Sequence, residues 1–374
     1  IDGLSIPPLF RCTGRRKFGY KWNYGTLIMF EDVPPLYVSS TADNEEEGWR
    51  YVTGDKEANR PPELLTRDHV ARKIVKEVKA GRGSPHGGVY LNIAWIKEHI
   101  KDSESHIKKK LPSMYHQFME LAEVDITKEP MEVGPTTHYV MGGIRVNAET
   151  QMSTVQGLFA CGECAAGLHG ANRLGGNSLS DLLVFGQLAG AGACDYARTL
   201  SATSAIDEEQ ATKIIRNATD ILNRESGENP YLLHEDLQAT MQDNVGIVRT
   251  EDELQKGIED VEQIKEKYKS IKAQGASQFN PGWHEALGMR NLLITAEAVA
   301  RAAEMREESR GAHTRDDFPS EQKEWLNYNI ISRKGTDGNM ELLKTERPEP
   351  NQELKRIAES TIEDLEKDIN SIAI

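Results

Sequence analysis

The stretch CGECAAGLHGANRLGGNSLSDLLVFG, residues 161–186, predicts a tight turn, a polar Gly-rich passage and then a helix. A β-type segment, residues 155–160, leads into it. Asn177 or Ser178 can cap the helix, and Asp181 stands where a capping box needs an acidic or amide side chain. The apolar side of the helix consists of Leu182, Leu183, Phe185 and Leu188. The free N–H groups at the start of such a helix form a site for an anion.

Arg173 lies just before this helix, in the passage HGANRLGG at residues 169–176. Its neighbouring glycines let the backbone approach a ligand closely. A guanidinium group can hold a carboxylate with two parallel hydrogen bonds. Arg173 is therefore a candidate for binding a carboxylate.

The 374 residues are enough for two or three domains. The 59 acidic and 45 basic residues give a formal net charge of -14, which has the wrong sign for binding a phosphate backbone, so no nucleic acid partner is expected. A dianionic substrate would be repelled by the chain as a whole, and a site for one must gather positive charge locally. No stretch reaches the ~18 apolar residues of a membrane helix, so partner subunits must hold the protein at any membrane where it works.

The four cysteines are Cys12, Cys161, Cys164 and Cys194. They are too few for a disulfide scaffold, which favours a reducing compartment. Cys161 and Cys164 fit the C-x-x-C pattern of thiol oxidoreductases, but that motif normally opens a helix, and here a Gly-rich loop follows. We expect a packing role for this pair, with thiol redox chemistry as the alternative. Because a second C-x-x-C is lacking, no metal site is predicted.

A helix is expected to start near Thr66 and to stop at Gly81. Its apolar face consists of Val70, Ile74, Val75 and Val78. Arg67 falls in the first turn, where a cation opposes the helix dipole. A nearby anion, or a guanidinium made a better proton donor by the positive helix end, can explain this placement. An ion pair with Asp68 or with a distant carboxylate explains it equally well, and the residues alone do not decide.

His138 opens the passage HYVMGGI, residues 138–144, just before a Gly-Gly turn. A single histidine in such a place is more often a hydrogen-bonding group of the fold than a ligand-binding group. The residues alone therefore favour the structural role, with ligand binding as the alternative.

Helices dominate the rest of the sequence. Short helices broken at Pro112 are expected over 92–123, and their core consists of Met114, Tyr115, Phe118, Met119 and Leu121. From about residue 205 the chain becomes charged and helical, and Thr250 with Glu253 forms a capping box. That helix is expected to reach Gly275 along Leu254, Ile258, Val261, Ile264, Tyr268 and Ile271. Two further helices are expected, at about 283–309 and after Pro350, the last with an apolar face of Leu354, Ile357, Leu365 and Ile369.

Four separated motifs carry a family resemblance. They are TRDHVAR at 66–72, HYVMGGI at 138–144, HGANRLGGNSLSDLLVFG at 169–186 and ESRGAH at 308–313. In this order, over roughly three quarters of the chain, they resemble the flavoprotein subunit of the succinate dehydrogenase/fumarate reductase family.

The resemblance implies an α/β plus all-α fold. It implies a capping domain at 1–132, the C-terminal part of an FAD-binding α/β domain at 133–203, and a helical C-terminal domain at 204–374 that offers a face to a partner subunit. The family's G-x-G-x-x-G loop for FAD has no match in the sequence. We expect that loop, and the histidine that often bonds the flavin covalently, upstream of Ile1. The family's Thr-Glu-Gly stretch is also lacking, and residues 10–17 read FRCTGRRK in its place.

The resemblance also assigns roles to residues. It implies that Arg67 is the acid/base residue and that His138 and Arg173 bind the substrate carboxylates. Because an isolated arginine stays protonated, Arg67 can act only within a proton relay. The residues implied to bind the flavin cofactor are Gly142, Gly143, Gly162, Glu163, Asn177, Ser178 and Leu179.

The function implied is interconversion of succinate and fumarate by hydride transfer to FAD, with electrons passed to an iron-sulfur subunit. Membrane anchor subunits would hold the complex at the cytoplasmic, inner face of a membrane. Two alternatives remain open. One is a flavoenzyme like L-aspartate oxidase, which shares the HGANR and ESRGAH motifs, and the other is a truncated, non-catalytic fragment that binds a partner.

Overall fold

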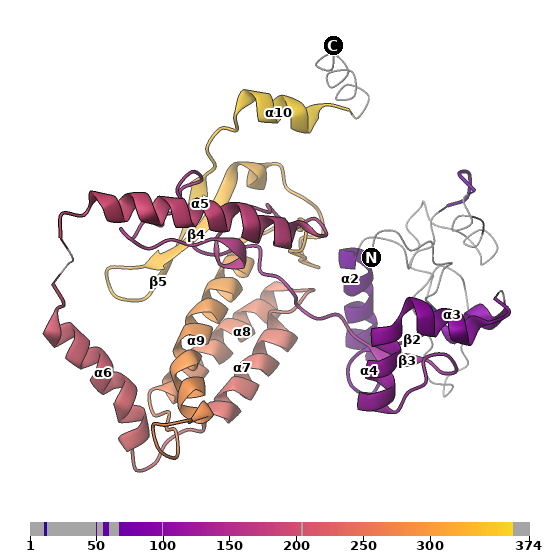
Figure 1. Ribbon diagram of the computed structural model, residues 1–374, viewed down its shortest axis with the longest axis horizontal. Helices are drawn as coiled ribbons and strands as arrows, with labels where there is room; N and C mark the ends of the chain where they lie inside the picture. Colours follow the sequence, from indigo (N-terminus) through magenta and orange to yellow (C-terminus); the bar gives the residue numbers. More distant parts are fainter. Residues whose placement is uncertain are drawn as a thin grey trace. The chain divides into compact units, whose positions relative to one another are not determined.

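The computed structural model describes residues 11–12, 50, 55–59, 67–98, 100–202 and 205–361 (Figure 1). The chain forms two compact units. Unit 1 comprises Ile1–Ala218, Gly246–Thr250 and Arg310–Asp316. Unit 2 comprises Thr219–Val245, Glu251–Ser309 and Asp317–Ile374. The expected division into three domains stays a prediction.

In unit 1, α2, Arg67–Glu77, continues into the π-helical turn η2, Val78–Arg82. Gly81 has a φ of 75° inside this turn, so the helix ends where glycine predicts. A small antiparallel sheet has the order β1-β2-β3. Its strands are β1 Arg11–Cys12, β2 Val89–Asn92 and β3 Met131–Val133.

Three short helices pack near this sheet: η3 Ala94–Glu98, α3 Ser103–Lys110 and α4 Pro112–Ala122. Their core consists of Ile93, Ile96, Ile107, Ile126 and Met131, with Met114, Tyr115 and Phe118 packed against it. Pro112 occupies the first turn of α4, where its missing N–H is not needed, so the expected break is confirmed. Met119 and Leu121 were expected in the core and are exposed, because they lie on the outer face of α4.

Residues 134–176 connect the sheet to α5 with little regular structure. The 3-10 turn η4, Gly162–Cys164, and isolated bridges are its ordered features. The segment 155–160 was expected to be a β-strand and is not one. Only Phe159 in it pairs, with Met152, because a turn at 155–158 interrupts the extended chain.

The long helix α5 spans Asn177–Thr199, so the helix expected after the Gly-rich passage is confirmed. Its cap is not the expected one. Gly176 is the N-cap residue, with a φ of 83° and no side-chain hydrogen bond, so neither Asn177 nor Ser178 caps the helix. Asp181 is buried and bonds elsewhere, which explains why it completes no capping box. The expected apolar side is partly uncovered, with Leu182 and Leu183 exposed.

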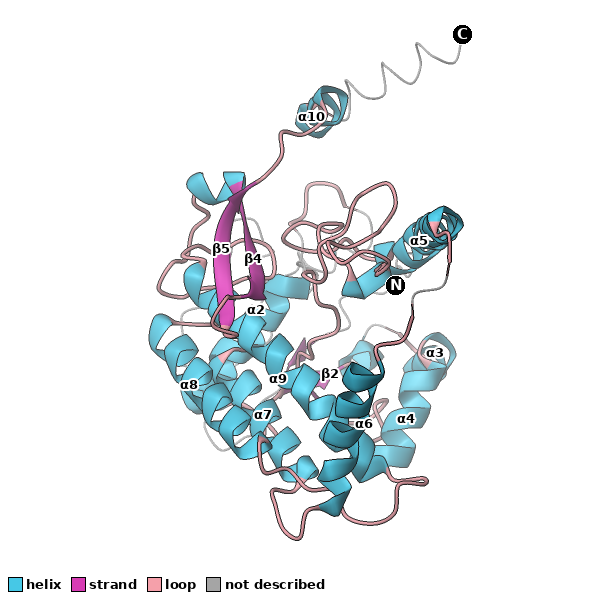
Figure 2. Cartoon of the chain, turned by 90° about the vertical axis from the view of Figure 1, so that its left-hand side faces the viewer, coloured by secondary structure: helices cyan, strands magenta, loops and turns pink. Residues whose placement is uncertain are grey.

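Helices build most of unit 2. After α6, Glu208–Asn223, come α7 Pro230–Asn244, α8 Glu251–Tyr268 and α9 Pro281–Met305. The last three lie side by side in both views (Figures 1 and 2). Their shared core includes Leu233, Leu237, Val261, Ile264, Met289 and Leu293. Helix α8 ends at Tyr268 instead of Gly275, since the chain there turns to pair Ile271 with Glu228.

The region at 204–374 is not helical throughout. An antiparallel hairpin of β4 Tyr328–Lys334 and β5 Met340–Glu346 follows the 3-10 turn η5, Glu324–Asn327. Helix α10, Gln352–Glu359, is the last described element. Of the expected apolar face of the last helix, Leu365 and Ile369 lie outside the described residues.

The described part of the chain therefore combines helices with sheet, as the expected fold class requires. Among the helices in it, none is long and apolar enough to cross a membrane.

Candidate functional site

Two of the sequence motifs lie side by side in unit 1. Ile144 forms a parallel bridge with Ala165. The amide of Ile144 donates to the Cys164 carbonyl at 2.8 Å, and the amide of Ala166 donates to the Ile144 carbonyl at 2.9 Å. The Gly-Gly turn of residues 138–144 is thereby held against the turn that follows Cys161.

Glycine is required at position 143. Its φ is 153°, and a Cβ added there would lie 2.5 Å from the Cys164 carbonyl oxygen. Gly162 has a φ of 68°, and a Cβ there would lie 2.5 Å from Cδ2 of Leu182 on α5. Both glycines serve close packing of the site's own chain, whereas a Cβ at Gly142 would meet open space. A close approach by a ligand is thus possible at Gly142.

Glu163 also stabilises the contact between residues 138–144 and the turn that follows Cys161. Its Oε1 accepts a hydrogen bond from the amide of Val140 at 2.9 Å. The side chain is exposed, so its second oxygen can still meet a ligand hydroxyl. Its predicted role toward the cofactor stays a prediction.

Arg173 lies over the ring of Tyr139, with its Cζ 4.7 Å from the ring centroid. One terminal nitrogen donates to the Leu174 carbonyl at 3.3 Å. The Nε atom is buried and has no hydrogen-bond partner. A guanidinium spread over an aromatic face is held by its charge and leaves its remaining donors for another acceptor.

Tyr139 is itself fixed by hydrogen bonds. Its hydroxyl donates to Oδ2 of Asp181 at 3.0 Å and lies 3.1 Å from Nε2 of His169. Burial, followed by the hydrogen bond to Asp181 and the charge of that carboxylate, raises the pKa of Tyr139 above its ordinary value. Tyr139 therefore remains a proton donor at neutral pH.

The structure brings the segments of His138 and Arg173 together. His138 directly precedes Tyr139 in the chain, its side chain is exposed, and Arg173 packs on the Tyr139 ring. Two groups that can bind carboxylates thus come from segments far apart in the sequence. Their predicted contacts with a substrate stay predictions.

Sequence reasoning missed Tyr139, His169 and Asp181. All three belong to the quoted motifs, and Tyr139 adjoins the residue chosen as a ligand-binding candidate. A tyrosine beside a candidate histidine, together with a second histidine in the Gly-rich passage, was the available signal. The contact of Tyr139 with Asp181 spans 42 residues, which no local pattern reveals.

The segment Arg310–Asp316 packs on the loop that carries Arg173. The amide of Ala312 donates to the Ala171 carbonyl at 3.0 Å. Gly311 has a φ of 58°, and a Cβ there would lie 2.4 Å from the same oxygen. The ESRGAH motif therefore supports the HGANR motif directly.

The same segment also contacts α2. Nη1 of Arg72 lies 3.5 Å from the hydroxyl of Thr314, and Lys76 forms a 2.7 Å ion pair with Asp316. The segment thus touches both α2 and the Arg173 loop within unit 1.

Arg67 is the first residue of α2, and its side chain lies outside the described part of the chain. Asp68 forms an ion pair with Arg72 at 2.6 Å, one turn along the helix. The explanations for the placement of Arg67 stay open. The acid/base role of Arg67 stays a prediction.

Arg315 lies within the segment Arg310–Asp316, and Arg249 pairs with it. Arg315 is fully buried, and Nη1 of Arg249 lies 2.9 Å from Nδ1 of His313. Burial, and after it the charge of Arg315, lowers the pKa of Arg249 to about 10. Cationic side chains are thus present within and beside the segment that supports the Arg173 loop.

The start of α5 is open to a ligand. No side chain caps it, and a Cβ at Gly175 or Gly176 would meet open space. Asn177 and Leu179 are exposed, and Ser178 is half-buried. The amides of Asn177 and Leu179 donate long hydrogen bonds of 3.3 Å to the Leu174 and Gly176 carbonyls. Because no side chain competes for this helix start, these residues fit the predicted flavin contact.

Cys161, Cys164 and Cys194 are free, and the Cys164 thiol donates to the Cys161 carbonyl at 3.2 Å. The alternative of thiol redox chemistry at Cys161 and Cys164 stays a prediction. No group of three His, Cys, Asp or Glu side chains within the described ranges is arranged to hold a metal ion.

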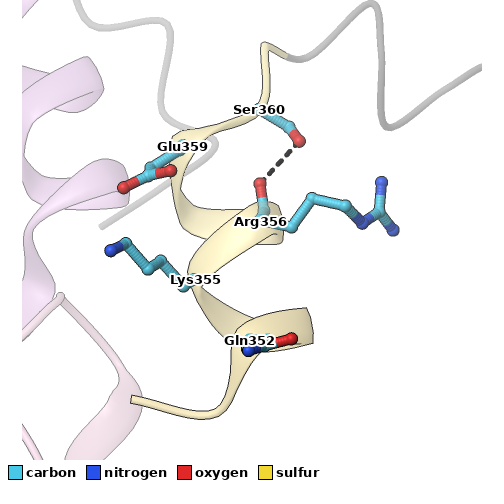
Figure 3. A pocket seen from close by; sticks show the side chains of 5 residues that line it. All are labelled: Gln352, Lys355, Arg356, Glu359 and Ser360. Atoms are coloured by element: carbon cyan, nitrogen blue, oxygen red, sulfur yellow. Dashed lines mark hydrogen bonds between the residues drawn. The ribbon is translucent and has the colours of Figure 1, made fainter. Parts of the chain in front are cut away.

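A hollow along α10 is a separate surface feature. It is lined by Gln352, Lys355, Arg356, Glu359 and Ser360, and the Ser360 hydroxyl donates to the Arg356 carbonyl at 2.7 Å (Figure 3). It belongs to unit 2 and contains none of the predicted site residues.

Family models match two parts of the chain. One, described as FAD binding domain, matches residues 39–179, and the other, described as fumarate reductase flavoprotein C-term, matches residues 234–361. The first match includes the turns and helix start described above.

Curated relatives agree with these matches. The succinate dehydrogenase flavoprotein subunit of Coxiella burnetii is 35% identical over 73% of this chain and 48% of its own length. The fumarate reductase flavoprotein subunit of Escherichia coli is 35% identical over 76% of this chain and 47% of its own length. The chain thus spans about half the length of the curated relatives it matches.

Solved structures are similar as well. The Mycobacterium smegmatis Sdh1 complex in the apo form matches with a TM-score of 0.73 and 49% identity, over 81% of this chain and 51% of the matched chain. Quinol-fumarate reductase with menaquinol molecules matches with a TM-score of 0.73 and 29% identity, over 94% of this chain and 57% of the matched chain.

Proposed function

The chain belongs to the succinate dehydrogenase/fumarate reductase flavoprotein subunit family, and we propose that it supplies the dicarboxylate-binding half of an FAD-dependent enzyme interconverting succinate and fumarate. The family is one of FAD-dependent oxidoreductases. The relatives named as succinate dehydrogenase or fumarate reductase subunits support this substrate pair.

One observation carries the proposal. Arg173 packs on Tyr139, the residue next to His138, so the segments that carry the guanidinium and the imidazole lie together. A small dicarboxylic acid needs a separate donor group for each of its two carboxylates. We assign His138 to one carboxylate and Arg173 to the other, which fixes the orientation of the carbon chain between them.

The flavin would lie against glycines and the start of α5. Gly142 and Gly143 would let its ring approach, and the N–H groups near Asn177, Ser178 and Leu179 would face its pyrimidine edge. Gly162 would keep the preceding turn close to α5, and Glu163 would accept hydrogen bonds from cofactor hydroxyls. When bound, FAD supplies the oxidation by accepting a hydride from succinate.

Arg67 would exchange the second proton of the reaction. It stands at the start of α2, where the positive helix end makes a guanidinium a better proton donor. An arginine that gives up a proton must regain it at once, so its action requires a proton relay. Asp68 and Arg72, paired on the same helix, are charged groups available near that end.

Electrons would leave through an iron-sulfur subunit. The cysteines of this chain lack the spacing of a cluster motif, so the cluster would lie on a partner. Several relatives are subunits by name, which supports assembly into a complex. Membrane anchor subunits would place that complex at the inner face of a membrane.

The decisive experiment titrates FAD against this chain and against a longer protein that contains it, followed by assays with succinate and with aspartate. We expect saturable quenching of flavin fluorescence and succinate oxidation coupled to an artificial electron acceptor by the longer protein. Aspartate-dependent peroxide formation without succinate oxidation would favour an enzyme like L-aspartate oxidase. Absence of flavin binding by both proteins would favour a non-catalytic, partner-binding fragment.

A further inference from the structure

A hydrogen-bonded group of three side chains lies behind Arg173. Tyr139 donates to Asp181 and lies 3.1 Å from His169, whose Nε2 is also 3.4 Å from Oδ2 of Asp181. The side chains of His169 and Asp181 are only 10% and 2% exposed. The Tyr139 and His169 rings meet edge to face, with centroids 5.3 Å apart. We call these three residues the tyrosine support.

The hydrogen bonds of the tyrosine support fix its protons. The Tyr139 hydroxyl has one proton and gives it to Asp181, which as a carboxylate can only accept. The contact with His169 therefore requires that the histidine Nε2 carry a proton and donate it to the Tyr139 oxygen. Each group then has one role, and the Tyr139 ring is held in a single orientation.

Arg173 uses the face of that ring. Its Cζ lies 4.7 Å from the ring centroid, and its buried Nε has no partner. A stacked guanidinium keeps its plane but retains free N–H donors. A ring that could rotate would let this plane tilt, and a two-point grip on a carboxylate would be lost.

The tyrosine support also includes a residue of α5. Asp181 lies in the second turn of α5, two residues after Leu179. Its Oδ1 is buried without a hydrogen-bond partner. Among the described residues, the polar contacts of the carboxylate are therefore those with Tyr139 and His169. The guanidinium and the start of α5 are thereby tied to one buried group.

We propose that Tyr139 is a positioning residue that orients Arg173 for one substrate carboxylate, with Asp181 and His169 fixing the tyrosine ring. This proposal rests on the proposed function, since it assumes that Arg173 binds a dicarboxylate. It adds three residues that act through Arg173 and do not touch the reacting atoms.

Tyr139→Phe in the holoenzyme tests the proposal, because it keeps the ring and removes only the hydroxyl. We expect the KM for succinate and the inhibition constant of malonate, a dicarboxylate that cannot be oxidised, to rise about tenfold, while kcat changes by about twofold or less. A merely structural role would lower the amount of active enzyme, and hence the apparent kcat per total protein, without changing KM or the malonate constant.

Tyr196→Phe is the matched control. Tyr196 lies on α5 in the same unit, and its ring packs on Phe159 at a centroid distance of 6.2 Å. Removing its hydroxyl should leave KM and the malonate constant unchanged. Asp181→Asn gives a second test, since its amide oxygen can still accept from Tyr139, and it should raise both constants less than Asp181→Ala does.

The outcomes separate the two proposals. If the unaltered holoenzyme neither oxidises succinate nor binds malonate, the proposed function is wrong. If it does both, and Tyr139→Phe and Asp181→Ala leave KM and the malonate constant at the values of Tyr196→Phe, the tyrosine support does not position Arg173. If Tyr139→Phe does not fold, the order of Asp181→Asn and Asp181→Ala decides.

Discussion

The helical core of unit 2 and helix α5 of unit 1 are both rich in apolar residues, yet they use them in opposite ways. Helices α7, α8 and α9 bury theirs against one another, as Leu233, Val261 and Leu293 illustrate. Helix α5 exposes Leu179, Leu182, Leu183 and Val184 by 53% to 77%. The comparison teaches that unit 2 draws its stability from its own contacts, whereas the described residues leave part of the apolar side of α5 uncovered.

The largest expected effect comes from the core of unit 2. Leu293→Ala should lower the free energy of unfolding by about 2–5 kcal/mol, because Leu293 is 2% exposed and its removal leaves a cavity among three helices. Leu183→Ala on α5, at a position 77% exposed, is the matched control and should change it by about 0.5 kcal/mol or less. Urea unfolding followed by circular dichroism measures both. Similar losses in the two variants would abolish the contrast between the regions.

The second prediction concerns the turn beside α5. Gly143→Ala should cost about 1–3 kcal/mol, since a methyl group would press on the Cys164 carbonyl and the residue would keep a positive φ. Gly142→Ala is the control, because a Cβ there meets open space. Hydrogen exchange at the amide of Ile144, which donates to that carbonyl, measures the local loss. Equal protection of this amide in both variants would contradict the packing role of Gly143.

The sequence predicted some elements of the fold and missed others. The period of Leu254, Ile258, Val261 and Ile264 predicts α8 because the helix buries that face against its neighbours. The hairpin of β4 and β5 was missed. Its strands mix charged and apolar residues and are mostly half-buried or exposed, so no clean alternation marks them.

The sequence likewise predicted part of the candidate site and missed the rest. The motifs selected His138 and Arg173, and the structure brings their segments together through Tyr139. The buried partner of Tyr139 is Asp181, which the sequence suggested as part of a helix cap. The N-cap residue is instead Gly176, in a left-handed conformation, so the Asp181 carboxylate is not used at the helix start and can form a tertiary contact. Local spacing could not predict the contact of Asp181 with Tyr139, because that contact depends on the tertiary fold.

The third prediction is a pH effect in unit 2. Burial raises the pKa of Glu297, but hydrogen bonds from Lys265 and Arg301, at 2.7 and 2.9 Å, outweigh it and lower the pKa below its ordinary value. The stabilisation is therefore present above the unfolded pKa of 4.5 and is lost as the pH falls through the lower folded value.

Glu297→Gln should remove on the order of 1 kcal/mol of stability at neutral pH and flatten the fall in stability at acid pH, below the ordinary pKa of a glutamate. Thermal unfolding at a series of pH values measures the slope. Glu266→Gln serves as control, because Glu266 pairs with Lys269 at a side chain 70% exposed. An unchanged slope in Glu297→Gln would mean that other carboxylates govern the acid loss.

The smallest expected effect compares the two helix starts. Asn229 caps α7 by accepting a hydrogen bond from the Tyr231 amide at 2.9 Å, whereas no side chain caps α5. Asn229→Ala should cost about 0.5–2 kcal/mol of stability, because it leaves that amide without its acceptor. Asn177→Ala at the start of α5 should cost nearly nothing in the chain without FAD, yet weaken FAD binding if that helix start meets the flavin. Chemical unfolding and FAD titration of both variants decide the matter. A stability loss at Asn177 equal to that at Asn229 would mean that α5 is capped by its own residues and not kept open for a ligand.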